Sequence, residues 1–365
     1  MKNLLLMLFS FFIFVGCAQK PVVVSKPTVE IIEEPKIIEE PEIVEKEEII
    51  VEEEPIVLDE GLNKIAVIYP SKIVGKYAKT TISTISAYLL FSNQQFQVET
   101  FDTYDESMQN IIFHLNDLKE KGFTKVIALF TQNGFNNLNS LEEPKDLNIY
   151  FPLINKSEIY TENKNFIFGG ISYDKQMNLL QTLSSGKNSM FYVQSYLGNK
   201  LRDSYLSNFG ESITKEIKRK NNKFKYIMND KRLIGSTVLL NTPIIKSSII
   251  MSQLTAYEIY PEKILSTQLN YSPLLLKLTQ VRDRENFFVA SSISEVDNFL
   301  EDYATLLGAD ITYNWVDYSS LVGVNYLLKN NESELIKSKI VENQVNYEES
   351  LYKSTFYGFQ KIPMN

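Results

Sequence analysis

The chain has 365 residues with 45 acidic and 37 basic side chains, a net charge of −8, and 44% hydrophobic residues. That length is enough for one large or two medium domains with a buried core. The chain contains one cysteine and one histidine, which excludes an internal disulfide framework and any metal site built from several histidines. Composition therefore favours a globular protein whose stability comes from its apolar core alone.

The N-terminus has the order of a secretory signal. Lys2 precedes the apolar stretch 4–15, and Cys17 follows it closely. This succession of basic, apolar and small residues is typical of signal peptides. The apolar stretch falls short of the roughly 20 residues that a membrane-spanning helix needs. We therefore expect residues 1–16 to be a signal peptide that is removed on export.

The four residues FVGC (14–17) resemble the lipobox of bacterial lipoproteins, in which the cysteine thiol takes a diacylglyceryl group and becomes the new N-terminus. The resemblance implies that Cys17 is lipidated, although Phe14 stands where Leu is usual and Val15 where a small residue is usual. A buried thiol and an uncleaved anchor are the alternatives. No Asp follows Cys17, and in well-studied Gram-negative bacteria this implies sorting to the periplasmic face of the outer membrane.

The next segment is strongly acidic. Residues 28–60 contain fourteen acids and two lysines, so their net charge is −12, whereas residues 61–365 together carry +1. The segment repeats short IIEEP-like units separated by prolines, and such charge and proline density opposes packing into a core. Residues 17–60 are therefore predicted to be a lipidated N-terminus and an extended acidic linker. Pairing of this segment with a partner, as a strand or a helix, is the alternative.

After residue 61 the pattern changes to alternating strands and helices. KIAVIYP (64–70) is a short apolar run rich in β-branched residues, as expected for a strand that is buried on both faces. Further strands are predicted at 96–103, 125–130, 148–154 and 165–171, with helices at 75–91 and 105–121. This order predicts a parallel sheet flanked by helices.

A second series of strands and helices begins near residue 172. Strands are predicted at 188–196, 236–242, 263–270 and 286–293, helices at 197–218, 295–307 and 316–329, and strand-like segments at 341–349 and 354–362. The two series predict an α/β protein with two lobes, each a mainly parallel sheet flanked by helices. The first lobe is predicted to contain residues 61–171 with 294–330, and the second residues 172–293 with 331–365.

Signatures of catalysis are absent from the sequence. His114 lies in an apolar helical pattern, no G-x-S-x-G motif is present, and no glycine-rich phosphate loop follows the first strand. The basic run KEIKRKNNKFK (215–225) is interpreted as an exposed helix end, with contact to an anionic polymer or partner as the alternative. We therefore expect a non-enzymatic protein with no cofactor, no metal site and no nucleic-acid partner.

The predicted strand ends carry polar, uncharged side chains. In open parallel sheets the carboxyl ends of the strands frame the usual ligand crevice. The candidate residues for a cleft between the lobes are Ser71, Thr131, Gln132, Ser172, Gln194, Asn241 and Asn270. Hydroxyl and amide groups of this kind suit recognition better than catalysis, so the cleft is predicted to bind a ligand if it has a function of its own.

Several segments resemble the type I periplasmic-binding-protein fold. KIAVIYPSKIVGKYAKTTISTISAYLL (64–90) is similar to the family's first strand, loop and helix, and 240–259 and 264–280 are similar to its second-lobe units. NWVDYSSLVGVNYLL (314–328) resembles the late helix that returns to the first lobe. In the amino-acid receptors of this superfamily, groups near the end of the first strand hold a carboxylate, and Ser71 is the counterpart here.

Within that superfamily the nearest resemblance is to the outer-membrane lipoproteins that activate penicillin-binding proteins, the LpoA/LppC type. Those proteins carry a helical-repeat domain where this chain has its acidic linker. The resemblance implies a non-enzymatic lipoprotein that docks on a periplasmic or inner-membrane envelope protein, such as a peptidoglycan synthase, and a linker with a reach on the order of 100 Å would serve that role. The alternative is a periplasmic receptor for an amino acid, a peptide or another small solute.

Overall fold

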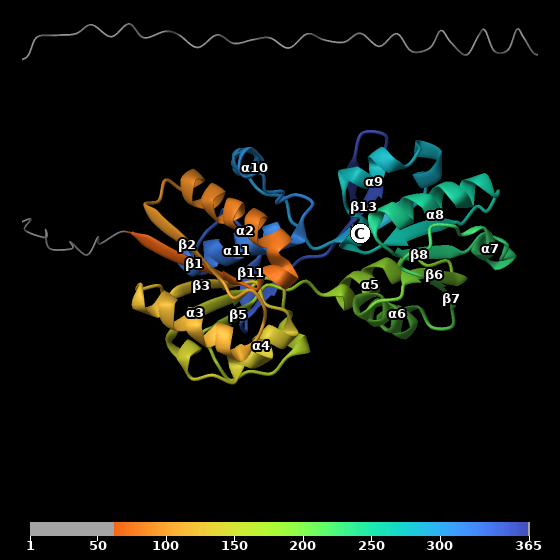
Figure 1. The fold of residues 1–365 in the computed structure, drawn as a ribbon. Helices are drawn as coiled ribbons and strands as arrows, with labels where there is room; N and C mark the ends of the chain where they lie inside the picture. Colours follow the sequence, from red (N-terminus) through yellow and green to blue (C-terminus); the bar gives the residue numbers. More distant parts are fainter. Residues whose placement is uncertain (1–61, 364–365) are drawn as a thin grey trace, which may run out of the picture. The chain divides into compact units, whose positions relative to one another are not determined.

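The computed structural model describes residues 62–363, so Cys17 and the predicted linker 17–60 lie outside the described residues. The described chain contains two sheets of seven strands each, flanked by helices (Figure 1). Nearly all neighbouring strands within each sheet are parallel, apart from pairs that involve the last strands of the chain. The predicted two-lobed α/β fold is confirmed.

The first sheet has the strand order β11-β12-β5-β4-β3-β1-β2. Its strands are β1 (Asn63–Tyr69), β2 (Phe96–Asp102), β3 (Lys125–Ala128), β4 (Asn148–Phe151), β5 (Phe166–Phe168), β11 (Lys339–Val341) and β12 (Gln344–Asn346). The helices of this lobe are α2 (Ser71–Phe91), α3 (Met108–Glu120), α4 (Gln132–Asn139), α10 (Asn298–Leu306) and α11 (Trp315–Lys329).

Strand β1 explains why this lobe has helices on both faces of its sheet. Ile65 and Val67 are fully buried among residues of α2, α10 and α11, whereas Ala66 and Ile68 are fully buried among residues of α3 and α4. Alternate side chains of a strand point to opposite faces, so a continuous apolar run requires cover on each side. Figure 1 shows α2 and α11 on one face of the sheet and α3 and α4 on the other.

Helix α11 approaches the first sheet closely because it presents small residues. A Cβ added to Gly323 would lie 2.4 Å from the ring of Tyr150 on β4. Beside this contact, the Tyr150 hydroxyl and Ser319 Oγ are 3.1 Å apart, and Ser320 Oγ lies 3.2 Å from Thr81 Oγ1 on α2. The buried hydroxyl groups of this layer thus hydrogen-bond to one another, as buried polar groups must.

The second sheet has the order β14-β13-β10-β9-β8-β6-β7. Its strands are β6 (Asn188–Val193), β7 (Ile213–Ile217), β8 (Thr237–Asn241), β9 (Lys263–Ser266), β10 (Phe287–Ser291), β13 (Ser350–Ser354) and β14 (Phe359–Ile362). Its helices are α5 (Tyr173–Gln181), α6 (Tyr196–Phe209), α7 (Lys225–Met228), α8 (Ile244–Ala256) and α9 (Pro273–Leu278). One apolar cluster lies on the α7–α9 face and another on the α5–α6 face.

The chain passes between the two sheets after β5, after β10 and after β12. The prediction that all of residues 331–365 belong to the second lobe differs from the structure in one respect, because β11 and β12 pair with the first sheet. The Phe168 amide of β5 donates a 2.8 Å hydrogen bond to the Asn343 carbonyl. Glu342 and Asn343 both have positive φ, which is typical of a tight hairpin turn. The single strand-like segment predicted at 341–349 is therefore two short strands, because the turn at Glu342 and Asn343 interrupts it.

The prediction of a helix over 197–218 was also wrong for the second half of this segment. Helix α6 ends at Phe209, Gly210 takes a φ of 68°, and the chain continues as strand β7 from Ile213 to Ile217. A glycine with positive φ is a common helix terminus. Strand β7 lies at the edge of the sheet beside β6, with Ser189 opposite Ile213. Because β7 is an edge strand with charged residues, the alternation of apolar and polar residues that indicates a strand was not recognised in its sequence.

Candidate ligand pocket between the two lobes

A pocket of about 770 Å³ is lined by residues of both lobes. Lys76 and Tyr77 of α2 and Trp315 of α11 belong to the first-lobe side. The second lobe contributes residues at the carboxyl ends of β6 and β8 and in the turn after β9. A pocket of this size accommodates a small organic molecule.

Of the predicted cleft residues, Asn241 lines this pocket. It is the last residue of β8 and is 2% exposed. Asn270 lies in the short 3₁₀ helix after β9, is fully buried, and donates through Nδ2 to the carbonyls of Leu240 and Thr242 at 3.2 Å. Asn270 therefore holds the turn that carries the pocket residues Tyr271 and Ser272 and does not itself line the pocket.

The other predicted residues have local partners or lie elsewhere. Ser71 begins α2, and its amide donates to Asp102 Oδ1 at 3.0 Å. Thr131 caps α4 and donates to Glu106 Oε2 at 2.6 Å. Ser172 caps α5. Gln194 is exposed after β6. None of these residues lines the pocket between the lobes. Of the predicted residues, Asn241 lines it, whereas Thr131 and Ser172 are helix N-caps.

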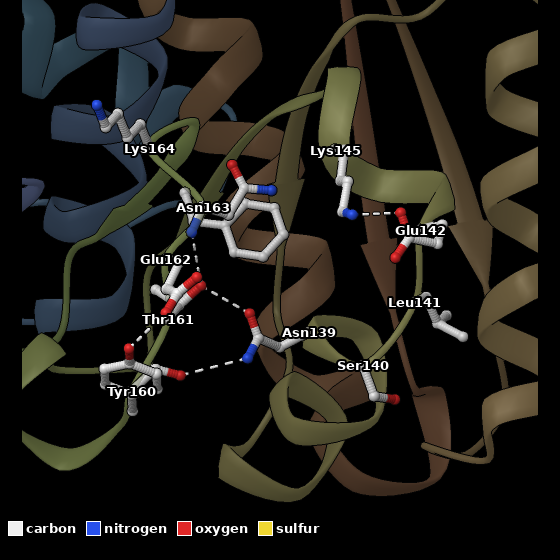
Figure 2. Close-up of a pocket in the computed structure, with 11 residues that line it drawn as sticks. Asn139, Ser140, Leu141, Glu142, Lys145, Tyr160, Thr161, Glu162, Asn163 and Lys164 are labelled. Atoms are coloured by element: carbon white, nitrogen blue, oxygen red, sulfur yellow. Dashed lines mark hydrogen bonds and ion pairs between the residues drawn. The ribbon is translucent and has the colours of Figure 1, made fainter.

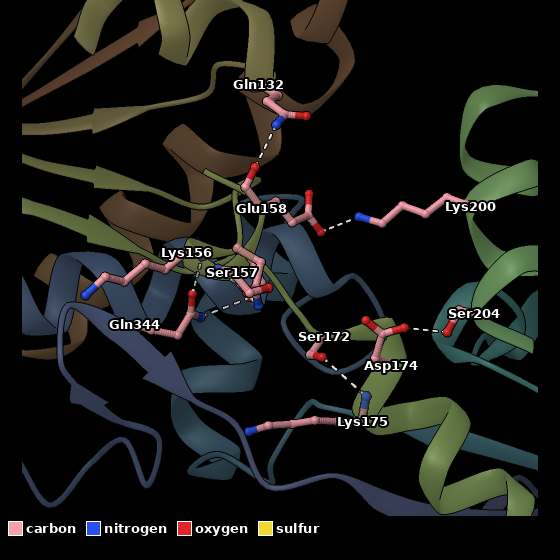
Figure 3. A network of polar contacts seen from close by, with 12 residues as sticks. Gln132, Lys156, Ser157, Glu158, Ser172, Asp174, Lys175, Lys200, Ser204 and Gln344 are labelled. Atoms are coloured by element: carbon pink, nitrogen blue, oxygen red, sulfur yellow. Dashed lines mark hydrogen bonds and ion pairs between the residues drawn. The ribbon is translucent and has the colours of Figure 1, made fainter. Parts of the chain in front are cut away.

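Gln132 belongs to a polar network that joins the lobes (Figure 3). Its Nε2 donates a 2.7 Å hydrogen bond to the carbonyl of Glu158 in the first lobe. The Glu158 carboxylate forms an ion pair with Lys200 of α6 in the second lobe. On the same side, Asp174 of α5 accepts a hydrogen bond from Ser204 of α6. The Glu158–Lys200 pair is thus a direct contact between the lobes.

Three helices begin at the pocket. The residues Ser195, Pro243 and Asn314 are the N-caps of α6, α8 and α11, and each lines the pocket. The N-terminus of a helix carries unsatisfied N–H groups and a partial positive charge. The starts of α6 and α8 favour an anionic ligand, whereas Asp317 in the first turn of α11 opposes this effect at the third helix.

The charged side chains of the pocket reinforce this potential. Lys76, Arg219 and Lys246 line it together with a single acid, Asp310. Neither Lys76 nor Arg219 forms an ion pair with another residue of 62–363. Asp310 is exposed, and its Oδ1 accepts the backbone N–H groups of Thr312 at 3.2 Å and Tyr313 at 2.8 Å, whereas Oδ2 has no hydrogen bond within residues 62–363.

Lys246 is nearly buried, with 7% of its surface exposed. Its Nζ donates to the Asn221 carbonyl at 2.6 Å and to Asn222 Oδ1 at 3.0 Å. Burial lowers the pKa of this ammonium group, because desolvation disfavours its charge. Lys246 therefore fixes the segment after β7, which includes Arg219, against the base of α8.

Two side-chain amides on the second-lobe wall have an orientation that the protein fixes. Gln268 Oε1 accepts hydrogen bonds from Gln176 Nε2 at 3.1 Å and from the Ser292 amide at 2.9 Å. Asn241 Oδ1 accepts from Thr267 Oγ1 at 3.1 Å. The remaining atoms, Asn241 Nδ2 and Gln268 Nε2, are buried and have no hydrogen-bond partner in the described part of the chain. Unpaired buried donors are rare in folded proteins, and both residues line the pocket.

Aromatic side chains supply the apolar part of the lining. The rings of Tyr271 and Tyr313 are 5.0 Å apart between centroids, and both residues line the pocket with Tyr77 and Trp315. Burial raises the pKa of the Tyr271 hydroxyl above its ordinary value. The pocket thus combines flat apolar surfaces with donors and positive charge.

Most residues that line this pocket could not be identified from the sequence. Gln268 lay inside a predicted strand that ends earlier, at Ser266. Arg219 lay in the basic run that was interpreted as an exposed helix end, and no pattern singled out Lys246. One pocket residue has a recognisable pattern, the asparagine of NWVDYSS. Asn314 is the N-cap of α11, and its Oδ1 accepts a 3.1 Å hydrogen bond from the Val316 amide.

A second pocket, of about 540 Å³, lies on the first lobe near the C-terminal end of α4 (Figure 2). Its polar groups bond mainly to one another. Thr161 Oγ1 donates to Asn139 Oδ1 at 2.7 Å, the Tyr160 hydroxyl donates to Glu162 at 2.7 Å, and Lys145 pairs with Glu142. Because these groups are mutually satisfied, the pocket lacks the unpaired donors of the site between the lobes.

The fold defines a class. Two lobes of mainly parallel sheet, joined by three crossings and enclosing a pocket, are the type I periplasmic-binding-protein fold. The sequence matches no family model, and no curated protein matches it significantly.

Solved structures with this fold include proteins of different roles. LivJ of Streptococcus pneumoniae, solved with isoleucine, has a TM-score of 0.59 and 10% identity over 82% of this chain and 100% of LivJ. A solute-binding protein of R. palustris, solved with 4-hydroxybenzoate, has a TM-score of 0.58 and 12% identity over 82% of this chain and 96% of that protein.

LpoA of Haemophilus influenzae has a TM-score of 0.58 and 11% identity over 83% of this chain, which spans 58% of the length of LpoA. At such identities the likeness shows the fold alone. The neighbours are binding proteins and receptors as well as LpoA, and they do not specify which role this chain has.

No helix among residues 62–363 is both long and apolar enough to cross a membrane.

Proposed function

We propose that this protein is a non-enzymatic receptor of the bacterial envelope that binds a small molecule in the pocket between its lobes. The observation that carries this proposal is the pair of buried amide donors, Asn241 Nδ2 and Gln268 Nε2, which lack acceptors and belong to residues that line the pocket. A bound molecule would supply the missing acceptors and remove the cost of leaving them unpaired, about 1–3 kcal/mol for each group.

The pocket favours the receptor over the docking protein that the sequence indicated first. Fixed donors, three helix N-termini and free cations around one cavity have a direct use in ligand recognition. They have none in a protein that acts only through its outer surface. The occurrence of isoleucine-bound LivJ with the same fold supports this proposal.

Trp315 offers a direct test of binding, because it is the single tryptophan of the chain and it lines the pocket. We expect a library of amino acids, short peptides and organic acids to contain a compound that changes the Trp315 emission and raises the melting temperature. A ligand at about 100 times its Kd adds about 2.7 kcal/mol to the free energy of unfolding. A library in which no compound changes either signal would reject the receptor function.

The second candidate function is docking on an envelope protein, such as a penicillin-binding protein, as LpoA-type lipoproteins do. The outer face of α10 favours it, since Phe299 is 71% exposed, Tyr303 is 43% exposed and Leu306 is 84% exposed. These residues recur at the spacing of one helix face. A photo-reactive residue at position 306 should then cross-link to a peptidoglycan synthase in living cells, and cross-linking to none would remove this candidate.

Both candidates place the protein at a membrane through Cys17, as a lipoprotein of the periplasmic face of the outer membrane. In cells, we expect Cys17→Ser to move the protein from the membrane fraction to the soluble periplasmic fraction without changing its melting temperature. If the substituted protein still sediments with membranes after a salt wash, lipid attachment at Cys17 is not the anchor.

A further inference from the structure

We propose that the second lobe binds the surface of a membrane that contains anionic phospholipids, through a basic turn that follows β7. The stretch 215–232 contains eight cationic and two acidic side chains, a net charge of +6. Residues 61–365 carry +1 in total, so those outside this stretch carry −5 together. Such an uneven distribution orients a protein in the field of a charged surface.

The basic turn, residues 218–225, presents cations that no acid neutralises. Five of its side chains are cationic and exposed, and they form no ion pair within residues 62–363: Lys218, Arg219, Lys220, Lys223 and Lys225. The two acids of the stretch lie outside the turn. Asp230 pairs with Lys215 and Arg232, and Glu216 accepts a 3.3 Å hydrogen bond from the Tyr192 hydroxyl. The charge of the turn is therefore available to a partner.

Protection of a sheet edge does not account for these cations. Lysines within an edge strand oppose its pairing with another chain, but β7 ends at Ile217, before the five cations begin. Strand β7 is the last in the order of the second sheet. The turn that follows it therefore lies at the rim of the lobe, where a flat surface can reach it.

Contacts with the body of the lobe fix the backbone of the turn. Phe224 is fully buried in an apolar cluster of the second lobe. Lys246 Nζ donates to the carbonyls of Lys218 at 3.5 Å and Asn221 at 2.6 Å. The Lys223 amide donates to Asn221 Oδ1 at 2.9 Å. Because the backbone is already ordered, less conformational entropy is lost when the turn meets an anionic surface.

Two exposed apolar side chains lie beside the cations. Tyr226 is 60% exposed, and its hydroxyl accepts a 3.2 Å hydrogen bond from Asn221 Nδ2. Ile245 is also 60% exposed and precedes Lys246, which contacts the turn. Tyrosine is favoured at the level of lipid headgroups because its ring is apolar and its hydroxyl is polar. Cations around exposed apolar side chains suit a membrane interface, whereas an acidic polymer in solution would match the charge alone.

Co-sedimentation with phospholipid vesicles tests this proposal. The chain from residue 18 is used, so that neither the apolar stretch 4–15 nor a lipid on Cys17 contributes to binding. The salt concentration is about 0.1 M, where charges act over about 10 Å. We expect binding to vesicles with equal parts of phosphatidylglycerol and phosphatidylcholine, and no binding to phosphatidylcholine alone. Binding to both kinds of vesicle, or to neither, would contradict the proposal.

Two sets of substitutions locate the binding surface. The basic-turn variant carries Lys218→Gln, Lys220→Gln, Lys223→Gln and Lys225→Gln. It should bind the anionic vesicles at least 100-fold more weakly with an unchanged circular dichroism spectrum, because each lysine near such a surface contributes about fivefold. The matched control replaces by glutamine four exposed lysines that form no ion pair within residues 62–363: Lys79, Lys277, Lys329 and Lys361.

The control changes the net charge by the same amount and should alter the affinity less than threefold. Equal losses in the two variants would show that net charge, and not the basic turn, causes the binding. None of the substituted lysines lines the pocket between the lobes, so this test does not depend on the proposed receptor function.

Tyr226→Ala tests the apolar part of the surface. We expect about a fivefold loss of affinity for the anionic vesicles, whereas Tyr357→Ala, at a side chain that is 94% exposed outside the turn, should leave the affinity unchanged. Poly-L-glutamate is the probe for an acidic protein partner. If the chain binds poly-L-glutamate in solution and no vesicle, the basic turn is a site for an acidic protein and the proposal is wrong.

Discussion

The interior of the first lobe and the pocket wall of the second lobe differ in whether their buried polar side chains have hydrogen-bond partners. In the first lobe, the Tyr88 hydroxyl donates to Asn325 at 3.0 Å and Tyr150 pairs with Ser319 at 3.1 Å. In the second lobe, Asn241 and Gln268 each keep a buried donor without an acceptor. Folded proteins pair nearly all such groups. Other unpaired atoms among residues 62–363, such as Tyr205 Oη and Arg284 Nε, belong to residues away from the pocket, whereas Asn241 and Gln268 line it, which supports a ligand site at this wall.

The largest effect should come from disturbing the paired region. Gly323→Val places side-chain atoms against the Tyr150 ring, which lies 2.4 Å from the position of an added Cβ. Overpacking of this kind costs about 1–3 kcal/mol or more, and urea unfolding measures it. Gly358→Val is the control, because an added Cβ there has no neighbour within 4 Å. Equal stability of the two variants would show that α11 is not tightly packed on the sheet.

Asp317 is an exception in the first lobe, as is His114 on α3, and it sharpens the comparison. It is fully buried in the first turn of α11, one of its oxygens has no partner among residues 62–363, and burial raises its pKa to about 6. The folded state therefore holds the proton more tightly than the unfolded state, so the free energy of unfolding should fall as the pH rises from about 4 to about 6.

Asp317→Asn should abolish this dependence, which amounts to about 2–3 kcal/mol. The Asp310 amide donates to Asp317 Oδ2 at 2.9 Å, and an asparagine oxygen accepts the same bond. Urea unfolding of wild type and variant at pH 4, 5, 6 and 7 measures the difference between them. A constant difference across this range would mean that Asp317 does not titrate there.

Lys246 tests the second-lobe wall. Lys246→Met retains the length of the side chain but removes the hydrogen bonds to the Asn221 carbonyl and Asn222. Because Lys246 holds the segment 218–222, we expect about a tenfold loss of affinity for the ligand of the pocket, about 1.4 kcal/mol, and faster hydrogen exchange in this segment. Lys277→Met, at the end of α9, is the control. Unchanged affinity in Lys246→Met would remove this lysine from the binding site.

The smallest effect concerns the contact between the lobes. Glu158 and Lys200 form an ion pair in which each side chain is 37% exposed, and such exposed pairs contribute about 0.2–1 kcal/mol. Lys200→Ala should weaken ligand binding less than about fivefold at low salt and not measurably at 1 M salt, where exposed charges are screened. A larger loss that persists at 1 M salt would assign Lys200 a role beyond this pair.

The fold followed from local patterns, whereas most of the pocket did not. A β-branched run such as Ile65–Ile68 identifies a buried strand on its own, and the two strand–helix series define the lobes. Asn241 was found because it ends a strand. Gln268 was missed because its role depends on Gln176 and Ser292, which lie far away in sequence and meet it only in the folded chain.

The errors have the same physical origin. The segment 341–349 was predicted as one strand of the second lobe, but the chain forms a hairpin at 339–346 that pairs with β5 of the first lobe. Arg219 follows the edge strand β7, and a basic run at a sheet edge has the same composition as a solvated helix end. Local sequence largely determines whether a segment forms a helix or a strand. The surroundings of a side chain depend on helices and strands that are distant in the chain.

The most direct test of the central claim separates a small-molecule extract of the source bacterium into acidic, neutral and basic fractions. The melting temperature of the wild-type protein and of the Asn241→Asp, Gln268→Glu double variant is then measured with each fraction. We expect one of the fractions to raise the melting temperature of the wild type alone. Stabilisation of both proteins by the same fraction, or of neither by any, would contradict a ligand site built on these two amides.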